Sequence, residues 1–100
     1  MEKKIAWNKS ATKRLTKDLK RISEEDSISQ AEGVEDAILN CINKALKNPE
    51  RYPPDKYKIK NEDNNHRAFE THSFRVSYRI TGKEVRILRI RHVKQCPKKY

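Results

Sequence analysis

The chain is 100 residues long and carries 24 lysine and arginine residues against 14 acidic ones, a formal net charge of +10. This length allows one domain, residues 1–100, because a chain of this size buries only about 60 to 65% of its unfolded surface. Hydrophobic residues make up 34% of the chain and charged residues 38%. We expect so lean a core to depend on a protein partner.

Neither the cysteines nor the apolar runs indicate a metal, a cofactor or a membrane. Cys41 and Cys96 stand in no zinc-binding spacing, so no metal site and no cofactor are predicted. No apolar run reaches the ~18 residues of a membrane span, and the N-terminus lacks the apolar core of a signal peptide. These features predict a cytoplasmic protein.

The N-terminal part of the chain predicts a short strand over Lys3 to Trp7 and then a helix, from a cap at Asn8 or Ser10 to about Ile22. Ala11, Leu15 and Leu19 form its apolar stripe at helical spacing. The opposite face is basic, and we favour a solvated surface there over a docking surface for an acidic protein. Its members are Lys9, Lys13, Arg14, Lys17, Lys20 and Arg21.

A second helix, a long loop and three strands are predicted next. Ser29 and Glu32 have capping-box spacing, and Pro49 ends the helix near Asn48. Residues 50–65 predict a loop, and three strands of an antiparallel meander follow, the first over His66 to Thr71. The order predicts an α+β fold, in which an antiparallel helix hairpin covers one mainly antiparallel sheet.

The last two strands form a hairpin with one apolar and one basic face. Phe74, Val76, Tyr78 and Ile80 alternate with polar or basic residues. A two-residue loop at Gly82 and Lys83 would pair Ile80 with Val85, Tyr78 with Ile87, and Arg79 with Arg86. The alternation then breaks, and a bulge near Leu88 would return Ile90 to the core and place Arg89 and Arg91 beside Arg75.

Positive charge is concentrated in the same region. Residues 65–100 carry 10 basic side chains against 2 acidic ones, whereas residues 1–64 carry 14 against 12. Basic side chains on neighbouring strands repel one another, so we expect an anionic ligand to lie on this face. The alternative is that these arginines only coat a solvated sheet face.

The hairpin and the element order resemble those of a known family. The pattern Phe74-Arg75-Val76-Ser77-Tyr78, followed by a last strand that ends in His92, resembles the RelE/ParE superfamily of bacterial type II toxins. The segment Trp7 to Ala11 also looks like the strand-to-helix junction of these proteins. The resemblance spans most of the chain and implies a toxin that is neutralised by a cognate antitoxin.

The resemblance implies two functions and does not choose between them. RelE-type members cut messenger RNA on the ribosome, whereas ParE-type members poison DNA gyrase without catalysis. An inactive member, kept for its antitoxin complex, is a third reading. Our leading prediction is the metal-independent, ribosome-dependent endoribonuclease, with the gyrase inhibitor as the alternative.

The nuclease branch also implies site residues. The arginine of this branch's YRxxY-like pattern corresponds to Arg75. A second basic residue, on the preceding strand, corresponds to Arg67, which would pair with Arg75 across the sheet. The branch often carries lysines before this pattern, and Lys58 and Lys60 either reach the site from a loop or are replaced by Arg67. His92 is the leading proton-transfer residue, with Tyr100 or Glu70 as its partner. The predicted RNA-binding residues are Arg79, Arg86, Arg89, Arg91 and Lys94.

Overall fold

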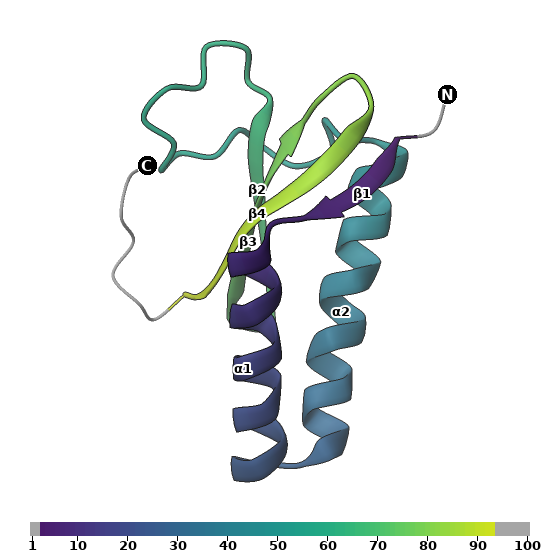
Figure 1. The fold of residues 1–100 in the computed structure, drawn as a ribbon, viewed down its shortest axis with the longest axis vertical. Helices are drawn as coiled ribbons and strands as arrows, with labels where there is room; N and C mark the ends of the chain where they lie inside the picture. Colours follow the sequence, from purple (N-terminus) through teal and green to yellow (C-terminus); the bar gives the residue numbers. More distant parts are fainter. Residues whose placement is uncertain (1–2, 94–100) are drawn as a thin grey trace.

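A computed structural model describes residues 3–93 of the chain as a four-stranded sheet with a helix hairpin packed on one face (Figure 1). Lys94, Cys96 and Tyr100 lie outside the described residues. The elements follow in the order β1 (Lys4–Trp7), α1 (Lys9–Glu25), α2 (Ile28–Lys47), β2 (His66–Thr71), β3 (Phe74–Ile80) and β4 (Glu84–His92). This arrangement confirms the α+β fold expected from the sequence.

The two helices are antiparallel, and both differ in detail from the prediction. α1 continues to Glu25, one turn beyond Ile22, where the apolar stripe ends. α2 begins at Ile28, and the hydroxyl of its N-cap residue Ser27 accepts a hydrogen bond from the Gln30 amide at 3.0 Å. The capping box predicted at Ser29 and Glu32 was therefore wrong. The N-cap is Ser27 and the residue three positions after it is Gln30, so both lie two positions earlier than predicted.

The strand order is β1-β4-β3-β2, with β1 parallel to β4 and the other neighbours antiparallel. The predicted register of the last hairpin is confirmed: Ile80 lies opposite Val85, Tyr78 opposite Ile87, and Arg79 opposite Arg86. The register then shifts by one residue at Leu88, since Ser77 pairs with Arg89. This is the predicted bulge, and it places Arg91 directly opposite Arg75.

The core lies between the helices and one face of the sheet. Ile38 and Ile42 of α2 and Ala11 and Leu15 of α1 pack there against the sheet. The strands contribute side chains at alternate positions, apart from the bulge between Ile87 and Ile90, and all of them are less than 10% exposed: Phe69, Phe74, Val76, Tyr78, Val85, Ile87 and Ile90. Removing this apolar area from water is the main force that holds the helix hairpin, α1 and α2, on the sheet.

Residues 48–65 form a loop, which begins two residues before the predicted start at residue 50, and this loop crosses the outer edge of β2 from one face of the sheet to the other. On the helix-covered face, Tyr52 packs against Phe69, with ring centroids 4.9 Å apart. At the edge, the carbonyl of Pro53 accepts the Ala68 amide at 3.3 Å, and the Asp55 amide donates to the His66 carbonyl at 2.8 Å. The loop therefore shields an otherwise exposed strand edge and delivers Asp55 to the opposite face.

Candidate functional site

The face of the sheet that the helices leave uncovered, here called the open face, carries most of the predicted arginines. Residues that lie opposite each other in neighbouring strands share a face, and the register places five arginines on this one: Arg75, Arg79, Arg86, Arg89 and Arg91. The sequence prediction of a basic face behind an apolar one is therefore confirmed in its geometry.

Arg75, the central residue of the predicted site, is buried and paired with two carboxylates. Its Nη2 donates to Asp55 Oδ1 at 2.8 Å, and its Nη1 donates to Glu70 Oε2 at 2.8 Å. The side chain of Arg75 is only 9% exposed, that of Asp55 is 0% and that of Glu70 is 52%. Burial alone lowers the pKa of Arg75, but the hydrogen bonds to Asp55 and then Glu70 outweigh it and raise the pKa.

Tyr57 covers this ion pair from the loop. Its ring lies 4.8 Å from the Arg75 guanidinium carbon and 5.2 Å from that of Arg91. Each distance is within the range of a cation–π contact. One aromatic ring thus holds two arginines whose mutual repulsion would otherwise destabilise the pairing of β3 with β4.

Arg67 does not pair with Arg75, and this part of the predicted site was wrong. Arg67 lies opposite Tyr78, on the face of the sheet that the helices cover, whereas Arg75 lies on the open face. Its guanidinium donates to backbone carbonyls of the loop, at Asn64 (3.0 Å), Glu50 (3.2 Å) and Tyr52 (2.7 Å). Arg67 therefore fastens the loop to β2.

His92 also lies away from Arg75. It is opposite Phe74, on the helix-covered side of the sheet, and the two rings meet edge to face with centroids 5.4 Å apart. Of the two proposed proton-transfer residues within residues 3–93, His92 and Glu70, only Glu70 lies at Arg75, and there it is held in an ion pair. Tyr100, the other candidate, lies outside residues 3–93.

The remaining predicted RNA-binding residues are spread along β3 and β4. Arg79 is exposed near the turn. Arg86 bonds to Glu84 Oε2 at 2.7 Å and to Asn8 Oδ1 at 3.2 Å. Arg89 lines a pocket beside α1. Lys94 falls beyond the described chain, and Lys58 and Lys60 lie in the loop.

Sequence reasoning missed Asp55 and Tyr57, the two loop residues that contact Arg75. The loop has no periodicity that would assign either side chain to a face, so no local signal placed them. The position of Arg67 could have been found, because Arg67 and Phe69 share the parity of a β-strand face. By the same rule, His92 shares the parity of the core residue Ile90.

A metal or membrane role gains no support from this part of the chain. Within residues 3–93, no group of three or more histidine, cysteine, aspartate or glutamate side chains could hold a metal ion. Neither of the helices in that range is long and apolar enough to cross a membrane.

A basic antiparallel sheet backed by a helix hairpin, with a parallel N-terminal strand at its edge, defines the class of RelE/ParE superfamily toxins. The family model described as ParE toxin of type II toxin-antitoxin system, parDE, matches residues 5–96. The chain belongs to this ParE toxin family.

A solved structure supports the fold. It is described as the chromosomal ParDE TA system from P. aeruginosa, and the matched chain superposes with a TM-score of 0.74 at 18% sequence identity. The match covers 93% of this chain and 98% of that one. No curated protein sequence matches this chain significantly.

Proposed function

We propose that this protein is a ParE-type toxin that poisons DNA gyrase and is neutralised by a cognate antitoxin. Family membership favours this function over the RelE-type endoribonuclease that the sequence pattern first suggested. The observation that carries the choice is the state of Arg75, whose guanidinium is buried and paired with Asp55 and Glu70.

A nuclease of this kind needs cations that meet the charge developing on the phosphate, and groups that move protons beside them. The charge of Arg75 is already balanced by two carboxylates from its own chain. A phosphate that approached Arg75 would have to displace the buried Asp55 and the Tyr57 ring. Arg67 and His92 cannot assist it, because both lie on the other face of the sheet.

The two functions are separated by assaying the purified protein against both targets. We expect inhibition of supercoiling when gyrase acts on relaxed plasmid, and intact messenger when the protein is mixed with programmed ribosomes. The control is the same assay with the antitoxin present, which should restore supercoiling. Cut messenger with normal supercoiling would overturn the proposal.

Substitution of Arg75 gives a second test. In a nuclease, Arg75→Ala would abolish cleavage while leaving the fold intact. Here we expect Arg75→Ala to lower the melting temperature, because it removes the guanidinium that pairs with the fully buried Asp55 carboxylate. Arg79→Ala, on the same strand and exposed, is the matched control and should melt like the parent protein. A fully stable Arg75→Ala protein would contradict the structural role assigned to Arg75.

The proposed targets also define the location and the partners. Gyrase and its DNA are cytoplasmic, so we propose that the toxin acts in the cytoplasm. The partner is an antitoxin, for which the adjacent reading frame is the first place to look.

A further inference from the structure

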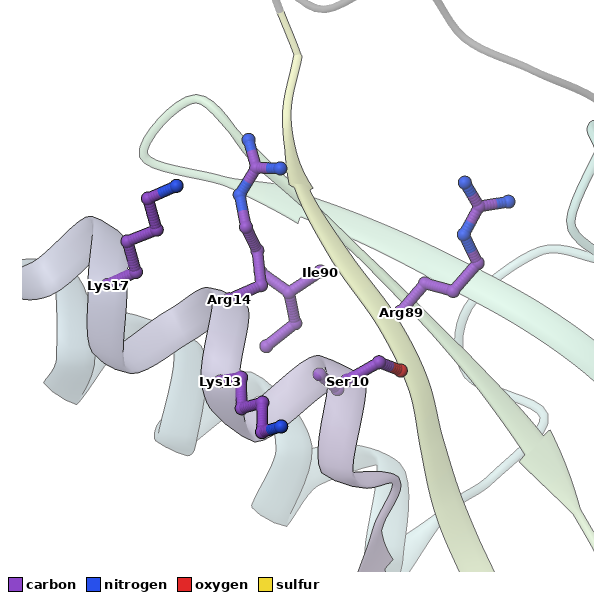
Figure 2. A pocket seen from close by; sticks show the side chains of 7 residues that line it. Ser10, Lys13, Arg14, Lys17, Arg89 and Ile90 are labelled. Carbon is purple, nitrogen blue, oxygen red and sulfur yellow. The ribbon is translucent and has the colours of Figure 1, made fainter.

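A pocket of about 420 Å³ lies between α1 and the second half of β4 (Figure 2). Here it is called the α1–β4 pocket, and it is lined by Ser10, Ala11, Lys13, Arg14, Lys17, Arg89 and Ile90. Figure 2 shows Ile90 pointing from β4 toward α1, with Arg89 on the other side of the strand. The pocket is distinct from the Arg75 cluster and uses the face of α1 that the sequence suggested was only solvated.

Its rim is positively charged. Lys13 and Lys17 are exposed and lie one helical turn apart, and neither has an acidic side chain within salt-bridge distance in residues 3–93. Arg14 lies between them and is held by Asp18, with Nε 2.9 Å from Oδ2. Arg89 adds a fourth cation from β4. Carboxylates at this rim would relieve the repulsion between Lys13 and Lys17.

Its base is apolar. Ala11 and Ile90 close the bottom of the pocket with 1% and 4% of their surfaces exposed. Because Ala11 and Ile90 are almost fully buried, most of the apolar surface that a ligand could cover comes from the methylene stems of the lysines and of Arg14 along the walls. The phosphates of a nucleic-acid backbone would match the charge of the rim, but the backbone offers no apolar group for the bottom of the pocket. A peptide with an apolar side chain between acidic ones satisfies both.

We propose that the α1–β4 pocket binds an acidic segment of the cognate antitoxin, with carboxylates at the lysine rim and an apolar side chain over Ala11 and Ile90. This inference rests on the toxin–antitoxin part of the proposed function and is independent of whether gyrase is the target. The rise of the helix separates Lys13 from Lys17 by about 6 Å along its axis. Alternate residues of an extended peptide are separated by roughly 6.6 Å, which matches that spacing.

The test reverses the two lysine charges. The Lys13→Glu/Lys17→Glu protein should bind the antitoxin, expressed from the adjacent reading frame, at least about tenfold more weakly in calorimetry. Glutamates at positions 13 and 17 would have basic residues, Lys9 and Arg21, four positions away on the helix, so this variant should fold; circular dichroism and thermal melting check this. Lys13→Gln/Lys17→Gln, which removes charge without reversing it, gives a second measure and should show a smaller loss.

The matched control is Lys60→Glu/Lys83→Glu, which changes the net charge equally at two exposed positions outside the pocket. It should bind the antitoxin like the parent protein. The gyrase assay is run on every variant, so a failure of the gyrase proposal would appear in the parent protein and leave the binding comparison intact.

Two results would overturn the inference. One is antitoxin affinity that is equal in the parent protein and in both pocket variants. The other is a loss of affinity for a 20-base-pair DNA duplex, used as a second probe, with antitoxin affinity unchanged. That result would assign the pocket to nucleic acid.

Discussion

Asp55 is the residue on which the open face of the sheet depends. Its carboxylate is fully buried and accepts hydrogen bonds from the Arg75 guanidinium at 2.8 Å and the Tyr57 amide at 3.0 Å. Glu70, the second partner of Arg75, is half exposed. Two carboxylates on one arginine should therefore differ widely in their contribution to stability, because water screens only the second.

We expect Asp55→Ala to lower the free energy of unfolding by about 3 kcal/mol, since it leaves the buried Arg75 charge without its buried carboxylate and with the half-exposed Glu70 in the remaining ion pair. Glu70→Ala should cost less than about 1 kcal/mol. Urea unfolding of both variants and the parent protein measures the difference. Equal losses for the two variants would show that burial does not separate their roles.

We expect His66 to make the stability of the protein depend on pH. Its Nδ1 is buried and has no hydrogen-bond partner among the described residues. Burial first, then the charges of Lys58 and Arg79, lower the pKa of His66 below its ordinary value of 6.5. Between the lowered pKa and 6.5, the unfolded chain binds more protons than the folded one, so stability rises with pH across this range.

The parent protein should accordingly lose stability as the pH falls from about 7 toward the lowered pKa of His66. A His66→Gln variant, which cannot titrate, should show a flatter dependence over that interval. Urea unfolding at several pH values between 5 and 8 tests this, with His72→Gln, an exposed position, as the control. Parallel curves for the parent protein and His66→Gln would assign the effect to other groups.

At the scale of the elements, the start of α2 depends on one hydroxyl. Ser27 is the N-cap, and its hydroxyl accepts a hydrogen bond from the Gln30 amide. Ser27→Ala should cost about 1 kcal/mol, whereas Ser29→Ala, one residue inside the helix, should change stability by less than about 0.5 kcal/mol. Thermal melting of the two variants compares the positions directly. A larger loss for Ser29→Ala would restore the capping box inferred from the sequence.

The last hairpin was predictable because its signals are local. The turn at Gly82 and Lys83 sets the register of the first pairs of this hairpin. The core positions Val85, Ile87 and Ile90 then require one extra residue between Ile87 and Ile90. The loop before β2 was predictable only as a loop. Its prolines and asparagines indicate irregular backbone, but nothing in them shows that it crosses the edge of the sheet.

At the scale of the molecule, the net charge of +10 works against compactness. Added NaCl should raise the melting temperature by screening this repulsion, and the rise should level off once the Debye length falls below about 8 Å. Scans between 10 and 300 mM NaCl, with sucrose at equal osmolarity as the control, measure it. A melting temperature that falls with NaCl would mean that attractive surface pairs outweigh the repulsion.

The order of the elements, the register and bulge of the last hairpin, and the resemblance to the RelE/ParE toxins could all be predicted from the sequence. These follow from period, turn and motif, which are properties of short segments. The contact between Asp55 and Arg75, twenty residues apart in the chain, and the hydrogen bonds by which Arg67 holds the loop could be seen only in the folded protein. Such contacts depend on the path of a loop that has no periodicity. They also depend on the packing that buries the Asp55 carboxylate against Arg75 of the sheet.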